Sequence, residues 1–261
     1  MQAAPEESEQ ASAAMATLCD ILGDGLLAVY LHGSAVSGGL RPQSDIDLLA
    51  VAERSLTKDE RAALLSSLLR LSARHPAVPG ERRCMEVMVF SRRDLADNLF
   101  PARAEFIYGE WLRDAFEAGE KPMPAQNPEL TLVLALARQE AKPLFGPDRE
   151  VLLPETPAAA VRRAMRDLLP SLQEGLQDDT RNVLLTLARM WHTACRGTFA
   201  SKDEAALWAI PKLTGEEALT LAKARQAYLG EIADSWHGDD QDAARRLADQ
   251  LALKLTEAMT A

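Results

Sequence analysis

Runs of apolar residues separated by turn residues predict three strands and one helix in the first part of the chain. Residues 26–33 (LLAVYLHG), 44–53 (SDIDLLAVAE) and 82–91 (RRCMEVMVFS) combine aliphatic, β-branched and aromatic side chains over strand length. Residues 57–75 (TKDERAALLSSLLRLSARH) carry leucines at helical spacing, with Thr57 at the N-cap position. An amphipathic helix ending near residue 22 precedes them. The order strand, turn, strand, helix, strand favours a mixed sheet over a helical bundle.

The rest of the chain reads differently. Residues 109–119 and 128–141 show helical patterns, and the proline-rich stretch 142–157 is interpreted as a connector. Beyond it the apolar positions follow helical spacing only, in five segments: 159–176, 179–195, 201–213, 215–231 and 239–259. We therefore predict an α+β protein with a sheet-containing domain at 1–156 and an all-α helical domain at 157–261.

Composition narrows the class of protein. The 261 residues are 47% hydrophobic and 26% charged, as expected of a globular domain, and the net charge of −10 disfavours a nucleic-acid partner. No apolar run is long enough to span a bilayer, and the acidic first residues do not resemble a signal peptide, so we expect a cytoplasmic protein. The three cysteines and four histidines are scattered, which predicts neither disulfides nor a zinc site. Nothing demands an oligomer, and a monomer is expected.

Two aspartates in one strand are the main chemical signal. Asp45 and Asp47 are separated by one residue, so both side chains point to the same face of an extended strand. Paired carboxylates repel each other unless they are protonated or bridged by a cation. Mg²⁺ prefers oxygen ligands and brings phosphate oxygens with it, so this pair predicts a magnesium–phosphate site. The ordinary alternative is a pair of acidic residues at an exposed strand end.

Two further residue groups support that site. Gly33 and Ser34 form a tight turn after the first strand, where backbone and hydroxyl can approach a phosphate. Glu86 is the single charge within the apolar strand 85–90, and faces either solvent or the same site as the aspartates. Each feature alone is weak, whereas the three in this order are specific.

The stretch HGSAVSGGLRPQSDIDLLAV resembles the signature of the polymerase-β-type nucleotidyltransferases. The wider chain is similar to the aminoglycoside adenylyltransferases that act on spectinomycin and streptomycin. This resemblance extends from about residue 17 to 237 and includes CMEVMVF, YGEWLRD, NVLLTLARMW, ASKDEAALW and AYLGE. It implies transfer of AMP from ATP to an antibiotic hydroxyl, with Mg²⁺, expected as two ions, as cofactor.

The resemblance also implies roles for residues of the first domain. Asp45 and Asp47 would hold the Mg²⁺ ions, joined by Glu86, which would also take the proton from the antibiotic hydroxyl. Gly33, Ser34 and Ser44 would contact the triphosphate. In-line transfer at a phosphorus atom needs positioning, charge neutralisation and a proton acceptor, and these residue types supply all three.

Other implied positions lie elsewhere in the chain. ATP contacts would come from Arg189, Lys202 and Tyr228, and the antibiotic site would include Glu86, Trp111, Asp179 and Asn182. From the residues alone, Arg189 and Lys202 could be surface bases and Asp179 only a helix N-cap.

The drug is predicted from one segment. Enzymes of this type that accept both drugs carry a Trp and an Asp where this chain has Pro170 and Gly175, and a histidine where it has Asn182. We therefore expect 9-adenylylation of spectinomycin. The alternatives are a dual-specificity enzyme that also modifies the 3″-hydroxyl of streptomycin, a protein-adenylylating antitoxin-type module, and an inactive nucleotide-binding regulator.

Overall fold

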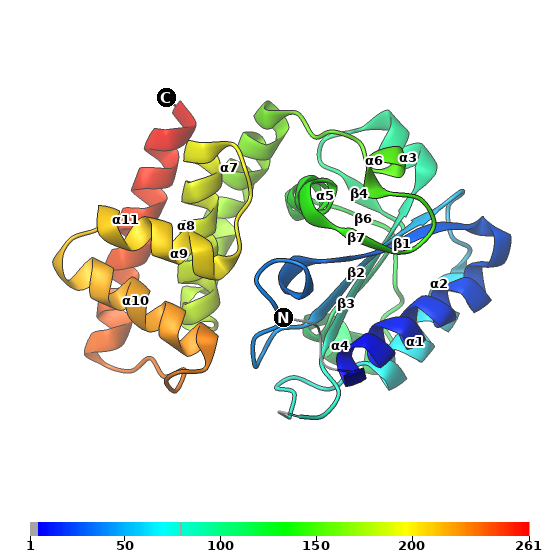
Figure 1. The fold of residues 1–261 in the computed structure, drawn as a ribbon, viewed down its shortest axis with the longest axis horizontal. Helices are drawn as coiled ribbons and strands as arrows, with labels where there is room; N and C mark the ends of the chain where they lie inside the picture. The colour runs from blue at the N-terminus through cyan, green and yellow to red at the C-terminus, as the bar shows by residue number, and fades with distance from the viewer. Residues whose placement is uncertain (1–4, 79, 261) are drawn as a thin grey trace. The chain divides into compact units, whose positions relative to one another are not determined.

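A computed structural model of the chain describes residues 5–78 and 80–260, with side chains from residue 9 onward. The chain divides into two compact units between Pro157 and Ala158. Figure 1 shows the helices and strands of both units, coloured by residue number. The predicted α+β class is confirmed: the first unit contains a mixed sheet and the second is helical.

The first unit is built on a five-stranded sheet of order β5-β3-β2-β1-β7. Among the strands of the described residues, β2 and β3 pair in parallel, and α2 connects them; the other pairs are antiparallel. The strands are β1 (Leu26–His32), β2 (Ile46–Ala52), β3 (Met85–Ser91), β5 (Phe106–Tyr108) and β7 (Lys142–Phe145). A separate two-stranded sheet joins β4 (Arg103–Ala104) to β6 (Ala125–Gln126).

Helices cover both faces of the large sheet (Figure 1). The helices α1 (Pro5–Leu22) and α2 (Lys58–Leu71) pack on one face, where Leu18, Leu64 and Leu48 belong to one buried cluster. On the other face α5 (Pro128–Glu140) buries Leu130 and Leu134 against β-strand residues such as Leu49. Shorter helices complete the unit: α3 (Arg92–Asp97), α4 (Arg113–Glu117) and α6 (Arg149–Leu152).

Local sequence explains where these helices begin. Thr57 caps α2 in a capping box with Glu60, as its predicted N-cap position indicated. Asn127 accepts a hydrogen bond from the amide of Leu130, and Pro128 occupies the first turn of α5, where its missing N–H has no cost. The sequence signals for helix starts are therefore realised in the structure.

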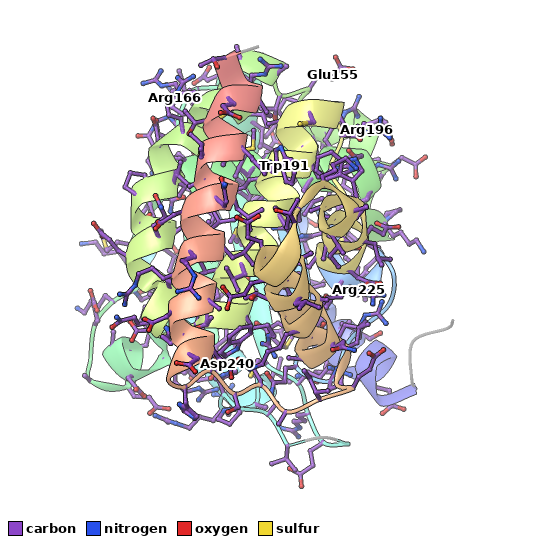
Figure 2. The ribbon with its side chains drawn as sticks, turned by 90° about the vertical axis from the view of Figure 1, so that its left-hand side faces the viewer. Glu155, Arg166, Trp191, Arg196, Arg225 and Asp240 are labelled. Carbon is purple, nitrogen blue, oxygen red and sulfur yellow. The ribbon has the colours of Figure 1, made fainter. Side chains whose placement is uncertain are left out.

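The second unit, as described over residues 158–260, contains five α-helices, and the other four pack around α8. These are α7 (Ala158–Glu174), α8 (Thr180–Arg196), α9 (Lys202–Ala209), α10 (Gly215–Leu229) and α11 (Asp239–Thr260). The apolar side chains of α8 are buried on most sides, and Trp191 packs edge-to-face on Trp208 of α9 with ring centroids 4.8 Å apart (Figure 2). Aromatic rings prefer such an edge-to-face arrangement, so this pair joins α8 to α9.

Two details differ from the predictions. The stretch 142–157 is not only a connector, because it contains the edge strand β7 and the helix α6. All four residues of β7 are exposed, so no alternation of buried and exposed positions marked it as a strand. The second strand begins at Ile46, which places Asp45 directly before it.

Candidate active site

The end of β1 turns back over an aspartate of β2. Gly33 has a φ of +65° and starts a short 3₁₀ turn, whose Val36 and Ser37 amides donate to the Gly33 carbonyl. A Cβ placed on Gly33 would overlap Oδ2 of Asp47 and lie 3.1 Å from its Cγ. Glycine is therefore needed here both for its backbone conformation and for space. The predicted Gly-Ser turn and one predicted metal ligand lie side by side.

Asp47 and Glu86 are direct neighbours on parallel strands. They are register partners in the β2–β3 pair, so their side chains emerge on the same face of the sheet. In each of these two strands this is the one residue that is not buried, next to six buried positions. Burial of a carboxylate without partners is costly, and the fold keeps both of these carboxylates partly accessible at one end of the sheet.

Asp45 lies at the beginning of the same strand. The amide of Ile46 donates to the carbonyl of Cys84 at 2.9 Å, which brings this part of the chain beside the start of β3. Burial, and then the negative charge of Asp45, raise the pKa of the Cys84 thiol to about 12. Asp45 precedes Ile46 directly, so the hydrogen bond from Ile46 to Cys84 keeps this part of the chain beside the segment that leads into Glu86.

Ser44 belongs to a tight turn before Asp45. Its amide donates to the carbonyl of Arg41 at 3.0 Å, and its hydroxyl oxygen accepts from the amide of Arg41 at 3.0 Å. A serine hydroxyl that accepts in this way still has its own proton to donate. The turn therefore orients a donor of the kind that a phosphate oxygen requires.

The three carboxylates fit magnesium in their chemistry. Within residues 5–78 and 80–260, no three His, Cys, Asp or Glu side chains converge closely enough to hold a metal ion by themselves. Mg²⁺ is usually held by one or two carboxylates, with substrate phosphates and waters completing its octahedron. The partly accessible aspartates and the Gly33 turn fit such a substrate-dependent site better than a protein-only cage.

His32 is a neighbour of this site that the sequence interpretation did not single out. It is the register partner of Asp47 across the β1–β2 pair and is 4% exposed. Burial lowers its pKa to about 4, so the imidazole is neutral at pH 7. Its position directly before Gly33 was the available signal. A row His32, Asp47, Glu86 therefore crosses three strands on one face of the sheet.

Trp111 lies beyond the end of β5, the strand next to β3. Its side chain is 60% exposed, and its ring covers Gly109, where a Cβ would overlap the indole. β3 and β5 are antiparallel, and their pairing ends with Val87 and Tyr108. Gly109 directly follows Tyr108 and therefore lies next to the end of β3 that carries Glu86. An exposed indole there is suited to stacking on a ligand.

Three helices of the second unit carry the predicted ATP contacts, and side-chain contacts connect these helices. The Lys202 ammonium, at the first position of α9, donates to the side-chain oxygen of Asn182 on α8. Asn182 and Arg189 lie two turns apart on one side of α8. The neighbouring Asp203 pairs with Arg225 of α10 at 2.5 Å, one turn before Tyr228. The N-terminus of α9 is thereby held to both α8 and α10.

Asp179 occupies the N-cap position of α8, yet its side chain makes no capping hydrogen bond. Its carboxylate is exposed, while the following Thr180 is buried and donates to the carbonyl of Leu176 at 2.7 Å. A purely local capping role is therefore absent, and the carboxylate is available to a cationic ligand.

No helix within the described part of the chain is both long and apolar enough to cross a membrane.

Two family models match this chain. The description "Aminoglycoside adenylyltransferase, C-terminal domain" matches residues 151–253, and "Polymerase beta, Nucleotidyltransferase" matches residues 23–77. The second match contains the Gly33 turn and both aspartates.

Similar proteins cover nearly the whole chain. A spectinomycin 9-adenylyltransferase of Staphylococcus aureus is 45% identical over 84% of each chain. An Escherichia coli aminoglycoside (3″)(9) adenylyltransferase is 38% identical over 88% of each chain. A crystal structure of an Enterococcus spectinomycin adenyltransferase with ATP and spectinomycin superimposes with a TM-score of 0.89 at 31% identity, covering 95% of this chain and 99% of that one.

Proposed function

This chain belongs to the aminoglycoside adenylyltransferases, enzymes that transfer AMP, and on that basis we propose that its antibiotic substrate is spectinomycin, modified at the 9-hydroxyl. The observation that supports the site most directly is the register pairing of Asp47 with Glu86 beside the Gly33 turn. The relatives named for spectinomycin alone include one at 45% identity, against 38% for the two-drug relative of Escherichia coli.

The proposed chemistry assigns Glu86 the proton of the antibiotic hydroxyl. As the hydroxyl oxygen attacks the α-phosphorus of ATP, the new P–O bond forms, the bond to the β-phosphate breaks and pyrophosphate leaves. A carboxylate placed to accept the hydroxyl proton assists this attack, because an alcohol alone is a very weak acid at neutral pH. The partly accessible position of Glu86 in an otherwise buried strand suits that role.

Asp45 and Asp47 are proposed to hold Mg²⁺, which when bound neutralises charge on the phosphates. Gly33, Ser34 and Ser44 are proposed triphosphate contacts. The hydroxyl of Ser44, oriented by the amide of Arg41, supports this assignment. The proposed roles of Arg189, Lys202 and Tyr228 toward ATP rest on the family resemblance, and the joined α8, α9 and α10 positions are compatible with them.

The preference for spectinomycin is proposed from the segment before α8. Pro170 lies inside α7, and Gly175 begins the 3₁₀ turn Gly175–Gln177, so these two positions present neither an indole nor a carboxylate. Asn182 already binds Lys202 through its side-chain oxygen. Glu86, Trp111, Asp179 and Asn182 are the proposed antibiotic contacts.

Pyrophosphate release by the purified protein with MgATP, spectinomycin and streptomycin in parallel tests this proposal. We expect turnover with spectinomycin only. Turnover with both drugs would identify a dual-specificity enzyme and overturn the interpretation of residues 170–182. No pyrophosphate release with either drug would contradict the proposed substrate, and a protein acceptor would be tested next.

Three broader proposals accompany the substrate: a cytoplasmic enzyme, a monomer, and no nucleic-acid partner. The net charge of −10 supports the last, because phosphate backbones are bound by basic surfaces. Light scattering after gel filtration would measure the mass in solution, and a value of two chain masses would exclude the monomer.

A further inference from the structure

One arginine connects the start of β3 to the turn that precedes Asp45. The guanidinium Nη1 of Arg83 donates to the carbonyl of Arg41 at 2.8 Å and to that of Ser44 at 3.0 Å. A third, longer contact reaches the carbonyl of Pro42 at 3.4 Å. The side chain thus binds the first and the last residue of the turn 41–44. Hydrogen bonds from a charged donor are stronger than neutral ones.

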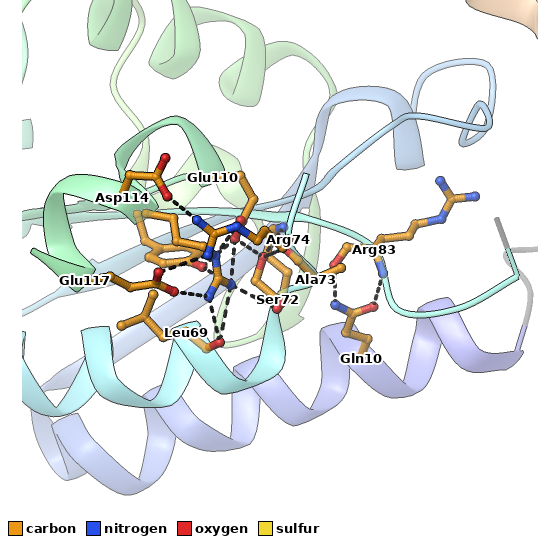
Figure 3. Close-up of polar contacts among 12 residues, drawn as sticks. Gln10, Leu69, Ser72, Ala73, Arg74, Arg83, Glu110, Asp114 and Glu117 are labelled. Carbon is orange, nitrogen blue, oxygen red and sulfur yellow. Dashed lines mark hydrogen bonds and ion pairs between the residues drawn. The ribbon is translucent and has the colours of Figure 1, made fainter. Parts of the chain in front are cut away.

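Gln10 holds the backbone of that arginine from the other side. Its Nε2 donates to the carbonyl of Arg83 at 2.7 Å and to that of Leu71 at 3.1 Å, while its Oε1 accepts from the amide of Arg83 at 3.0 Å. Figure 3 shows the two contacts between Gln10 and Arg83. Gln10 is 9% exposed, so it lies inside the unit, where solvent competes little for these bonds.

The turn needs such an anchor because the chain before it is permissive. Gly38 and Gly39 have φ values of +81° and +87°, a region that glycine reaches without strain. The hydrogen bonds between Arg41 and Ser44 close the turn internally but do not fix it to the sheet. Arg83 supplies a contact of that kind from a position two residues before the start of β3.

We propose that Arg83, held by Gln10, is a positioning residue for the nucleotide end of the active site. This pair, the Gln10–Arg83 clamp, sets where Ser44 donates and where Asp45 enters the site. The inference rests on the proposed function, in which Ser44 contacts the triphosphate and Asp45 the metal. Arg83 itself acts through the turn, since its guanidinium binds backbone carbonyls at both ends of that turn.

A clamp makes a different prediction from simple stabilisation. Loss of folded enzyme lowers the apparent kcat and leaves both KM values unchanged, whereas a displaced turn weakens the site for MgATP specifically. We therefore expect Arg83→Met to raise KM for MgATP and the half-saturating Mg²⁺ concentration by about tenfold, because small misplacements of binding groups are costly. KM for spectinomycin at saturating MgATP should stay within about twofold of wild type.

The adjacent arginine is the matched control. Arg82 is exposed and donates to the carbonyl of Arg70 at the end of α2, away from the turn. Arg82→Met removes the same charge one residue earlier, and we expect wild-type constants. Arg83→Lys keeps the charge and a nitrogen donor but lacks the rigid, planar guanidinium that directs the N–H bonds of Nη1 to both ends of the turn. An intermediate KM for MgATP is therefore expected, and this variant serves if Arg83→Met does not fold.

Gln10 provides the coupling test. Gln10→Met should raise KM for MgATP by about threefold, although Gln10 belongs to α1 and binds only backbone groups. The double variant should have a KM for MgATP no higher than that of Arg83→Met alone, because residues of one network act non-additively. Two results would overturn the clamp. One is a KM for MgATP in the double variant that rises by the product of the two single effects. The other is a KM for MgATP in the Arg83 variants equal to that of Arg82→Met.

Wild-type turnover separates this inference from the proposed function. If the wild-type protein turns over no drug, the proposed substrate fails, and calorimetric titration of the same variants with MgATP then decides about the clamp. Weaker MgATP binding by Arg83→Met than by Arg82→Met supports it, and equal binding contradicts it.

Discussion

Gly33 and Asp47 are so close that no side chain fits between them: a Cβ on Gly33 would lie 3.1 Å from Cγ of Asp47 and overlap its Oδ2. Because Asp47 is a proposed metal ligand, this contact links a backbone requirement to catalysis. The turn can approach bound phosphates only while residue 33 lacks a side chain.

Gly33→Ala should lower turnover by at least about a hundredfold, since it displaces Asp47 as well as the turn. The matched variant is Gly23→Ala, because Gly23 also has a positive φ, +51°, and a Cβ added there would have nothing within 4 Å. Both changes cost ~1 kcal/mol of backbone strain, but only the first should affect kcat/KM. Equal loss of activity in the two variants would contradict the role of the Gly33–Asp47 contact.

Glu86→Gln should strongly reduce transfer while leaving the fold intact, because the amide cannot accept the hydroxyl proton and is nearly isosteric with the carboxyl group. We expect kcat to fall by ~10²-fold or more, within the usual contribution of general base catalysis. Pyrophosphate release is the measurement, and thermal unfolding checks the fold. Retained turnover would remove Glu86 from the proposed chemistry.

Trp111→Ala should raise KM for spectinomycin and leave stability almost unchanged, since the indole is 60% exposed. Stacking contacts of an aromatic ring contribute ~1 kcal/mol, so a rise of about fivefold is expected. Met123→Ala is the control, because Met123 is equally exposed in the same unit. A loss of stability with an unchanged KM would assign Trp111 a structural role instead.

Arg113→Met should destabilise the first unit by ~3–5 kcal/mol, because it leaves the buried Glu110 carboxylate without its cation. Nε of Arg113 donates to Glu110 at 2.6 Å, within the network drawn in Figure 3. The control is Arg74→Met in the same network, where the ion pairs to Asp114 and Glu117 are exposed and screened by solvent, so a much smaller loss is expected. Urea unfolding compares the two variants, and similar losses would contradict the distinction between buried and exposed pairs.

Glu60→Gln should reduce stability at pH 7 and have no effect at strongly acidic pH. The hydrogen bond from Arg54, together with those from Thr57, lowers the pKa of Glu60 from 4.5 to about 2. The folded-state pKa is below the unfolded value, so this stabilisation is present above pH 4.5 and is lost as the pH falls toward 2.

Since Arg54 is largely exposed, the difference at pH 7 should not exceed ~1 kcal/mol. Glutamine also serves at this position of a capping box, so the comparison isolates the charge. Urea unfolding at pH 7 and at several pH values between 4.5 and 2 measures it, and the difference in stability should shrink steadily over that range. A difference independent of pH would show that the lowered pKa of Glu60 does not contribute.

Much of the fold could be predicted because its central strands are continuous apolar runs and its helices carry capping signals. The strand β7 could not be predicted, since an exposed edge strand has no buried face to produce an alternating pattern. The helices of the second unit could be predicted because each packs one apolar stripe against its neighbours, and α8 is apolar on most sides.

The candidate site could be predicted from the sequence only in part. The spacing of Asp45 and Asp47 predicts that they share one face, but the strand begins only at Ile46. The neighbour of Asp47, Glu86, is set by the register of β2 and β3, which the spacing does not report. His32 was missed because its burial depends on the strands beside it, and Arg83 because its partners lie about forty residues earlier in the chain. Contacts of that range are set by tertiary packing, which no local pattern reports.

The parallel pairing of β2 and β3 also governs when the enzyme becomes active during folding. Asp47 and Glu86 sit on strands separated by the whole of α2, and parallel strands cannot form a local hairpin. Helices form early and non-local pairings late, so refolding chains should regain their helical circular dichroism before any turnover. Activity in this protein therefore reports completion of the sheet, and partly folded chains carry the proposed metal ligands and the proposed base without an assembled site.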